Sequence, residues 1–562
     1  MFTITMYRRH FYYSVPRKFS SCPNLAVLYL LFSNQPYFCE ERRPLVTTVA
    51  SPDNSPNAEN TVSEPETSGI SPVRLEKLNA LRAAGLDPFA PERFDRSHPL
   101  HAVHEEFDAL ENQTVQIAGR IRALRWMGKA AFLDLMDESG RAQVYMKRDD
   151  IGAEIYDALK SGLDLGDFIG VEGYVFKTKT GEPSVHGAKI TVLSKSLRDV
   201  PFGKEYEGGS GEANKLTDVE TRYRQRYVDL FVNRDARDVL VKRIKITRAI
   251  REYLDSQGYL EVETPVLQAE AGGATARPFD THHNALNTDL HLRISLELYL
   301  KRLIVGGLDK VYEIGRVFRN EGISTRHNPE FTLLELYEAY TNLEGMMDIT
   351  EGIFRRICET INHGATTHRI NDEITLDFGT PWRRLPILQG IEEYAGIGRA
   401  AFASLETAKA AMAKVGLDPA KENQVGGIIE KLHEVFTQPK LVQPTFITEF
   451  PLETSPLARK KPGDEFLVRR FESYVFMQEV GNAFSEINDP LDQRERFEAQ
   501  SLLKAAGDKE AMPMDEDFLR ALEYGMPPTG GFGMGIDRVA MIFTGAESIR
   551  DVIFFPLLRP EK

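Results

Sequence analysis

Cysteines and long apolar runs are both scarce in this chain, and each scarcity excludes a class of protein. The 562 residues contain three cysteines, Cys22, Cys39 and Cys358, whose spacing fits neither a zinc site nor a disulfide framework. The longest apolar run covers residues 25–32, far short of the roughly 20 residues that a membrane-spanning helix needs. We therefore expect a protein of a reducing compartment, with no structural zinc and no membrane anchor.

Positive charge is also in deficit. The chain has 69 lysines and arginines against 83 aspartates and glutamates, which gives a formal net charge of −14. This balance argues against bulk, non-specific binding of nucleic acid, although it is compatible with a local basic face. Apolar residues make up 42% of the chain, and a chain of this length should form two or more domains with sizeable cores.

The first 70 residues differ in composition from the rest. Residues 1–25 are basic, aromatic and free of acidic side chains, and residues 51–69 lack any apolar periodicity. We expect residues 1–70 to be a disordered tail, a presequence, or extra sequence that results from a translation start assigned too far upstream. Ordered structure should begin at Ser71 and Pro72, which are a typical cap and first residue of a helix.

The segment 71–200 is predicted to form one domain. From residue 114 the hydrophobic period changes to two, and the resulting short strands, with one helical run at 151–163, are typical of a β-barrel of the OB type. Phe132 and Gln143 would let a base stack on a ring while an amide reads its edge. The alternative is an ordinary barrel with a core phenylalanine. Four basic residues without an acid among them precede Leu133, namely Arg120, Arg122, Arg125 and Lys129.

The remaining chain is predicted to be a linker, residues 201–232, followed by a larger domain, residues 233–562. The domain opens with an amphipathic helix within 239–259, and strands then carry most of the unusual polar clusters while helices surround them. We expect an α+β fold.

One hairpin concentrates charged and aromatic side chains. Residues 310–320 and 330–340 alternate as strands around a loop. Strand period puts Phe331, Leu333, Glu335 and Tyr337 on one face of the second strand. On the first strand Arg319 and Glu321 should share a face, and the loop adds Arg326 and His327.

This combination suits two kinds of ligand. Arginines bind phosphate oxygens and an aromatic ring stacks on a purine, which favours a nucleotide. Glu335 and Tyr337, further along the strand, suit a cationic partner. The alternative is a charged hairpin closed by its own salt bridges.

Two later clusters strengthen the nucleotide interpretation. Asn482, Phe484 and Glu486 share one strand face, and Glu472 and Glu479 precede them as candidate ligands of a divalent metal. An acidic pair of this kind is otherwise a solvated edge. The third cluster has glycines at 530, 531, 533 and 535 that permit close backbone approach, followed by Arg538 in the first turn of a helix. It is neither a Walker loop nor a dinucleotide fingerprint.

These segments resemble known motifs. Residues 258–268, with Pro265, resemble motif 1 of the class II aminoacyl-tRNA synthetases, residues 318–340 resemble motif 2, and residues 531–543 resemble motif 3. Several further stretches resemble lysyl-tRNA synthetases of the bacterial type, at 222–230, 272–286, 296–307, 454–460 and 549–560. The resemblance runs from about residue 71 to the end of the sequence.

The resemblance implies an α+β chain with an OB-type anticodon-binding barrel and a class II catalytic domain, whose central antiparallel sheet is flanked by helices. It implies ATP-dependent activation of L-lysine and transfer to tRNA(Lys) by a cytoplasmic homodimer that uses ATP as substrate and up to three Mg²⁺ ions per subunit. The implied ATP ligands are Arg319, Glu321, His327, Asn328, Phe331, Glu472, Glu479 and Arg538, with Arg319 and Arg538 catalytic and Glu472 and Glu479 holding Mg²⁺. The implied lysine ligands are Gly273, Glu297, Arg319, Glu335, Tyr337, Asn482, Phe484 and Glu486.

The resemblance also implies anticodon contacts from Arg125, Phe132, Gln143 and Glu182. The family often has two adjacent arginines where this chain has Leu124 and Arg125, which removes one expected contact. Three alternatives remain: a lysyl transferase that modifies a protein, a catalytically inactive tRNA-binding paralogue, and an asparagine- or aspartate-type paralogue, which Glu335 and Glu486 disfavour. The barrel favours tRNA as the acceptor, and the presence of Arg319 and Arg538 favours activity.

Overall fold

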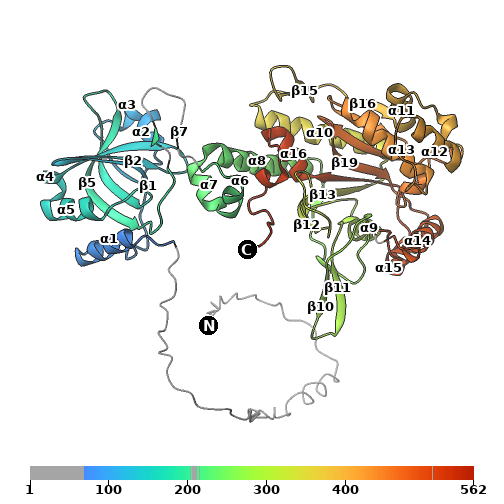
Figure 1. Cartoon of the computed structure of the whole chain (residues 1–562), viewed down its shortest axis with the longest axis horizontal. Coiled ribbons are helices and arrows are strands. Elements are labelled where there is room, and N and C mark those ends of the chain that lie inside the picture. The colour runs from blue at the N-terminus through green and yellow to red at the C-terminus, as the bar shows by residue number, and fades with distance from the viewer. Residues whose placement is uncertain (1–68, 203, 206–211, 214–215, 509, 562) are drawn as a thin grey trace, which may run out of the picture. The chain divides into compact units, whose positions relative to one another are not determined.

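The computed structural model describes residues 69–562 except 203, 206–211, 214–215, 509 and 562. The expected tail, residues 1–70, lies outside the described residues apart from its last two. Figure 1 shows a strand-rich part followed along the chain by a larger part built around one sheet. Within the described ranges, no helix is both long enough and apolar enough to cross a membrane.

The first folded part is a closed barrel of five strands. The barrel part comprises α1 (Pro72–Ala83), α2 (Ala102–Glu105), α3 (Phe107–Leu110), β1 (Thr114–Met127), β2 (Ala130–Met136), β3 (Arg141–Lys147), α4 (Arg148–Ile151), α5 (Ala153–Gly162), β4 (Phe168–Lys177) and β5 (Pro183–Ser194). The strands pair in the order β1-β2-β3-β5-β4. The predicted OB-type barrel is therefore confirmed, and the expected helical run corresponds to α4 and α5.

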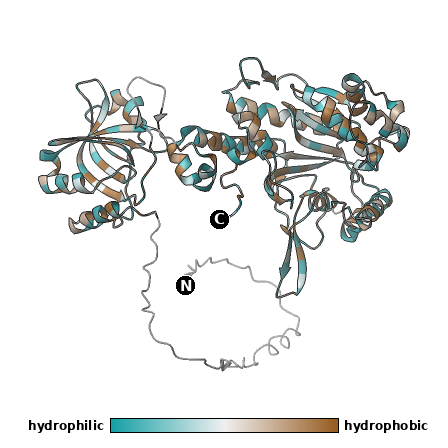
Figure 2. Ribbon diagram, in the orientation of Figure 1, coloured by the Kyte–Doolittle hydropathy of each residue, from teal (hydrophilic) through white to brown (hydrophobic). Residues whose placement is uncertain are grey.

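Strand alternation explains how the barrel fills its interior. Along β2 and β3, buried residues alternate with half-exposed ones, because successive side chains of a strand point to opposite faces. The inward side chains form one apolar cluster that also includes Leu81 of α1 and Leu159 of α5. Figure 2 shows hydrophobic and hydrophilic positions mixed along the barrel strands.

The segment expected as a linker, residues 201–232, contains β6 (Lys204–Glu205), β7 (Glu212–Ala213), α6 (Val219–Arg224) and α7 (Arg226–Val232). Its two helices bind the C-terminal segment of the chain. The hydroxyl of Tyr223 donates to Asp551 at 3.0 Å. Arg226 is buried and donates to the carbonyl oxygens of Arg550 at 2.7 Å and Phe554 at 3.1 Å.

The larger part is built on an eight-stranded sheet in the order β16-β17-β18-β19-β20-β13-β12-β8. Its strands are β8 (Leu260–Glu261), β12 (Lys310–Phe318), β13 (Glu330–Ala339), β16 (Arg383–Pro386), β17 (Thr445–Thr448), β18 (Arg470–Val475), β19 (Gln478–Ser485) and β20 (Thr529–Gly535). Neighbouring strands from β17 to β12 are antiparallel, as predicted. The two outermost pairings, β8 with β12 and β16 with β17, are parallel, so the whole sheet is mixed.

Helices and short strands surround this sheet, as predicted. The helices are α8 (Arg234–Ser256), α9 (Glu297–Val305), α10 (Leu343–Ile361), α11 (Ile387–Ala395), α12 (Leu405–Lys414), α13 (Val425–Leu432), α14 (Pro490–Ala505), α15 (Glu516–Glu523), α16 (Ile536–Thr544) and α17 (Ile549–Val552). The short strands are β9 (Leu267–Gln268), β10 (Asp280–His283), β11 (Thr288–Leu292), β14 (Thr367–Arg369) and β15 (Thr375–Asp377).

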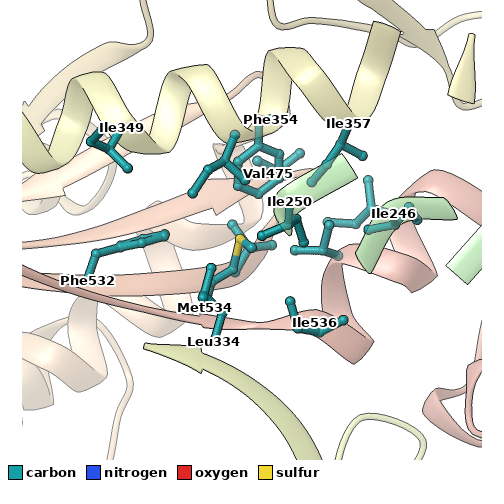
Figure 3. Packing of buried hydrophobic residues seen from close by; sticks show 14 of the residues in the cluster. Ile246, Ile250, Leu334, Ile349, Phe354, Ile357, Val475, Phe532, Met534 and Ile536 are labelled. Carbon is teal, nitrogen blue, oxygen red and sulfur yellow. The ribbon is translucent and has the colours of Figure 1, made fainter. Parts of the chain in front are cut away.

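The main core lies between one face of the sheet and the helices α8, α10 and α16. In Figure 3, Phe354 of α10 and Ile250 of α8 point toward Leu334, Phe532 and Met534 on the central strands. A second cluster joins the opposite face of β12 and β13 to α9 and α15. The polar residues of the predicted site belong to this second face, because they alternate along β13 with the core residues.

Candidate active site

The β12–β13 hairpin places the predicted residues as strand period requires. In its register Val317 lies opposite Phe331. Leu334 and Leu336 face the core, whereas the four alternating side chains face a cavity of about 370 Å³. The four are Phe331, Leu333, Glu335 and Tyr337. The prediction of one shared face is confirmed.

The prediction for the first strand of the hairpin was wrong in one respect. Arg319 and Glu321 were expected on a strand face, but β12 ends at Phe318 and both residues belong to the connection that follows. Both still line the cavity, together with His327 and Asn328 of the same connection. Loop backbone, and not strand pleating, therefore directs these side chains.

A strand of glycines forms the floor between two polar strands. β20 lies between β13 and β19, so Gly533 is paired with both Glu335 and Asn482. Two positions further, Gly531 is paired with Tyr337 and Phe484. The alternating residues of β20, Phe532 and Met534, face the core instead.

Gly531 leaves space that no other residue type would leave. A Cβ atom built there would lie 2.1 Å from Oε1 of Glu486 and 2.4 Å from Cε1 of Tyr337. Both distances are far below a van der Waals contact, so these two side chains occupy the place that a Cβ would fill. At the cavity wall Gly273 has φ +85°, in the region that favours glycine, and packs against Ser295 and Glu297.

One end of the cavity carries buried carboxylates. Oε1 of Glu335 accepts hydrogen bonds from Ser295 Oγ at 2.8 Å and from the amide of Leu296 at 3.2 Å. Oε2 accepts from the hydroxyl of Tyr337 at 3.3 Å. Burial, with the nearby charge of Glu297 second, raises the pKa of Glu335 to about 7.

Glu486 lies beside this end without lining the cavity itself. It is fully buried and forms an ion pair with Lys301 of α9, whose Nζ also lies 2.5 Å from Oε1 of Glu297. Among the described residues, Oε1 of Glu486 has no hydrogen-bond partner. Burial raises the pKa of Glu486 to about 8, although the charge of Lys301 opposes this shift.

The other end of the cavity carries arginines and an aromatic ring. The guanidinium carbon of Arg319 lies 5.1 Å from the ring centroid of Phe331. Arg538, the third residue of α16, donates to the carboxylate of Glu479 at 3.0 Å and to its carbonyl oxygen at 3.0 Å. A ligand with a positive and a negative end would therefore meet opposite charges at the two ends of one cavity.

Two loop residues add hydrogen-bonding groups at the arginine end. Asn328 is buried and its Nδ2 donates to the carbonyl of Glu330 at 2.7 Å, while its Oδ1 has no partner within the described part of the chain. His327 is exposed and its Nδ1 lies 3.0 Å from Oγ of Ser324. Partial loss of hydration of the ring, then the charge of Arg538, lowers the pKa of His327.

The two candidate metal ligands lie on neighbouring strands. Glu479 lines the cavity, whereas Glu472 does not and is held by Arg470 at 2.6 Å and by the hydroxyl of Tyr474 at 2.7 Å. Burial raises the pKa of Glu472 to about 7, and the charge of Glu479 adds to the shift. Two carboxylates whose charges repel fit a hard cation, and Mg²⁺ commonly takes one or two carboxylates plus phosphate oxygens. No group of three or more metal-ligating side chains is found in the described ranges.

Three residues of the site were not predicted from the sequence. Lys301 and Ser295 were missed because a lysine in a helix and a serine in a loop carry no special pattern. Arg470 is half-buried and lines the cavity, and its Nε donates to Oδ1 of Asn482 at 3.1 Å, tying β18 to β19. Its position two residues before Glu472 was the available signal, because such residues share a strand face.

The predicted nucleic-acid residues lie on or beside the outer side of the barrel strands. Arg125 of β1 is paired with Phe132 of β2, and Phe132 alternates with buried residues. Oε1 of Gln143 accepts a hydrogen bond from Ser184 Oγ at 3.1 Å. Glu182 immediately precedes β5.

An aromatic group next to Phe132 was missed by the sequence analysis. The ring of Tyr145 lies 5.1 Å from that of Phe132, and the rings of Phe176 and His186 lie 6.0 Å and 5.0 Å from Tyr145. These side chains come from β3, β4 and β5, and the pairing of β5 with both β3 and β4 brings them together. The group offers stacking surfaces for unpaired bases.

Comparison with known proteins agrees with both parts of this geometry. Residues 218–559 match the family described as "tRNA synthetases class II (D, K and N)", and residues 115–193 match "OB-fold nucleic acid binding domain". The chain belongs to the class II tRNA synthetase family. This class II chain is 50% identical to a "Lysine--tRNA ligase" of Moorella thermoacetica, over 87% of this chain and 98% of that protein. It is also 50% identical to the protein so named from Enterococcus faecalis, over 87% and 97%.

Proposed function

We propose that this class II synthetase is a lysine–tRNA ligase, which activates L-lysine with ATP and transfers it to the 3′ end of tRNA(Lys). The observation that carries this function is the polarity of the cavity. Buried carboxylates lie at one end and arginines with a stacking ring lie at the other. An aspartate-specific site would instead need a cation free to bind the substrate at the carboxylate end, whereas the ammonium of Lys301 is paired with Glu297 and Glu486.

Lysine is proposed to lie along the acidic half of the cavity. Its ε-ammonium is bound by three groups and its alkyl chain lies against Phe484. The three groups are Glu335, Tyr337 and Glu486. Its α-ammonium is bound by Glu297 and the backbone at Gly273, while Asn482 and Arg319 bind its carboxylate. Support for this orientation comes from the unpartnered Oε1 of Glu486 and from the carboxylate of Glu335 at the cavity wall.

ATP is proposed to occupy the arginine half. The adenine lies between Phe331 and Arg538, where a π-face and a guanidinium form two sides of the cavity. Glu321, His327 and the free amide oxygen of Asn328 bind the base and phosphates. Arg319 lies between the two halves and contacts the α-phosphate.

The first chemical step needs positioning more than acid–base catalysis. The lysine carboxylate is ionised near pH 7, so it attacks the α-phosphorus without a general base, and pyrophosphate leaves from the opposite side. Arg319 and Arg538 stabilise the negative charge that develops on the phosphate oxygens. Glu472 and Glu479 would hold Mg²⁺, which supplies further positive charge to the polyphosphate when it is bound.

In the second step the terminal ribose hydroxyl of tRNA attacks the lysyl-adenylate and AMP leaves. The barrel, residues 71–200, is proposed to select the tRNA, and residues 233–562 are proposed to perform both steps. Arg125, Phe132, Gln143 and Glu182 read the anticodon. The aromatic group around Tyr145 supports this, because it gives splayed bases additional stacking surfaces.

The active species is proposed to be a cytoplasmic homodimer. The segment that resembles motif 1 exposes apolar side chains beside Pro265, with Leu260 at 52% and Leu267 at 48% exposure. Exposed apolar side chains of this kind are typical of surfaces that a second subunit covers.

One assay tests the function directly. The purified chain is incubated with ATP, bulk tRNA and each amino acid in turn, and the amino acid that becomes linked to tRNA is identified. Lysine alone should be linked. Transfer of lysine to protein, or no transfer at all, would overturn the proposal.

A substitution tests the assignment of the acidic end. Glu335→Gln should lower lysine-dependent pyrophosphate exchange by about 30-fold or more, since loss of a buried charged partner costs about 2 kcal/mol or more. The matched control is Glu338→Gln on the same strand, because Glu338 bonds to Tyr259 and Lys310 and does not line the cavity. Equal exchange in the two variants would refute the assignment of Glu335.

A further inference from the structure

Lys301 is a buried cation at the acidic end of the cavity, and the proposed lysine-binding residues do not include it. Its side chain is fully buried, and its ammonium pairs with Glu297, one helical turn earlier on α9, and with Glu486, just after β19. The ammonium also lies 5.9 Å from the ring centroids of Tyr337 and Phe518. Two of the carboxylates proposed for the substrate therefore already share a cation from the chain itself.

The charges at this end balance only when Lys301 is counted. Glu297, Glu335 and Glu486 carry three negative charges when ionised. Lysine brings two ammonium groups, and its carboxylate is matched separately by Arg319. Three carboxylates, two substrate ammonium groups and the ammonium of Lys301 therefore sum to zero. Without Lys301 the bound state would bury one uncompensated negative charge, which is strongly unfavourable in a protein interior.

We propose that Lys301 is a positioning residue that acts through Glu297 and Glu486 and fits the site to a substrate with two ammonium groups. It favours the ionised forms of both carboxylates and fixes them in place before lysine arrives. This inference rests on the proposed lysine ligase function, and it adds a residue that determines specificity.

Geometry and burial support this role. Oε2 of Glu486 pairs with Lys301, which leaves Oε1 without a partner and adjacent to Gly531 at the cavity floor. Lys301 thus engages one oxygen and leaves the other available to the substrate. The groups that face this cluster are Glu297 on α9, Glu335 and Tyr337 on β13, Glu486 after β19, and the Phe518 ring on α15. The nearby charges of Glu297 and Glu486 raise the pKa of Lys301 in spite of its burial, so it stays charged near neutral pH.

The test measures lysine and ATP dependence separately in the full chain. Lys301→Met keeps an unbranched side chain of similar volume and removes the ammonium group. Its KM for lysine in pyrophosphate exchange should rise about tenfold or more, equivalent to 1.4 kcal/mol, while its KM for ATP stays unchanged. The pH at which lysine KM is lowest should move upward, because Glu297 and Glu486 lose the cation that favours their ionised forms.

The barrel provides a matched control. Lys195 is also fully buried and also pairs with two carboxylates, those of Asp164 and Asp167, at 2.7 Å and 2.8 Å. Lys195→Met removes a buried cation of the same kind away from the cavity, so it should leave the lysine KM and its pH profile unchanged.

A second variant keeps the proposal testable if Lys301→Met does not fold. Lys301→Arg keeps the charge but replaces a compact ammonium with a planar fork, which displaces both carboxylates and should also raise the lysine KM. A folded Lys301→Met or Lys301→Arg with unchanged lysine KM and pH profile would overturn the inference. Loss of folding in both would assign Lys301 to stability alone and would overturn it too. If the unmodified chain shows no lysine-dependent exchange, the proposed function fails, which is a different result.

Discussion

Two carboxylates of the cavity, those of Glu335 and Glu486, ionise near neutral pH because the protein withdraws them from water. A glutamate exposed to water is fully ionised near neutral pH, so its charge would not change with pH in this range. In the folded protein, the same side chain becomes a much better partner for a cation, because little water competes with the ammonium of the ligand. Burial therefore gives these residues both their affinity for a cation and their sensitivity to pH.

Lysine binding should consequently depend on pH. Below about pH 6 both carboxyls are largely protonated, since their pKa values are about 7 and about 8, whereas the ε-ammonium of lysine stays charged up to about pH 10. Lysine affinity should therefore rise as pH increases from about 6 to about 8.5. Calorimetric titration with lysine alone checks this, because it avoids the separate titration of Glu472 near the nucleotide. A flat profile over this range would contradict the prediction.

Gly531 should be intolerant of any side chain. In Gly531→Ala the new methyl group would overlap Glu486 and Tyr337 and displace the groups that hold the ammonium. We expect the kcat/KM for lysine in pyrophosphate exchange to fall about tenfold or more, in line with the 1–3 kcal/mol cost of overpacking. Gly533→Ala is the comparison, because its Cβ would lie 3.5 Å from Cγ of Glu335 and 3.9 Å from two backbone oxygens, which are ordinary contacts. A larger loss at Gly533 than at Gly531 would show that the floor is misassigned.

At the scale of elements, the sequence predicted individual strands better than it predicted which strands lie next to one another in the sheet. The alternation in residues 330–340 predicted which side chains share a face, and the structure confirms that face. The sequence did not show that β20 lies between β13 and β19, because pairing of distant strands leaves no local pattern. It also did not show the connection after Phe318 or the ion pair between Lys301 and Glu486, which lie 185 residues apart in the chain.

The helix α16, which follows the glycine-rich strand β20, is held in place by one buried aspartate. Asp537 of α16 pairs with Arg243 of α8 at 2.5 Å and accepts a hydrogen bond from the amide of Thr332 on β13 at 2.7 Å. Asp537→Asn would leave the Arg243 charge without its partner and should lower the free energy of unfolding by about 3 kcal/mol. Denaturant unfolding measures this loss. Glu252→Gln, which breaks exposed pairs with Arg248 and Arg356, should leave the unfolding midpoint unchanged.

At the scale of the whole molecule, two parts with separate cores carry separate tasks. The barrel and the sheet each bury their own apolar cluster, and the proposed tRNA residues lie in the barrel part whereas the cavity lies in the larger part. The sequence predicted a barrel at residues 71–200 and a larger α+β domain at residues 233–562. It did not predict that α6 and α7 bind the C-terminal segment, because those contacts are mostly made by single arginine and tyrosine side chains.

Substitution in the barrel should therefore change tRNA use without changing amino-acid activation. Phe132→Ala should lower kcat/KM for tRNA in aminoacylation by about tenfold to a hundredfold, since one stacked base contributes about 1–3 kcal/mol. Pyrophosphate exchange without tRNA should stay the same. Phe89→Ala removes a 51% exposed ring of the same part outside the strands and should affect neither assay. Equal loss in both assays would instead indicate damage to folding.

The glycine strand also limits how this protein can evolve. A floor made of backbone offers no side chain that mutation could exchange for another of different size or charge. New amino-acid preferences would have to arise through the flanking strands and α9, whose residues already depend on one another through shared ion pairs. A change of amino-acid specificity would therefore require several substitutions together. Each single mutant would be inactive.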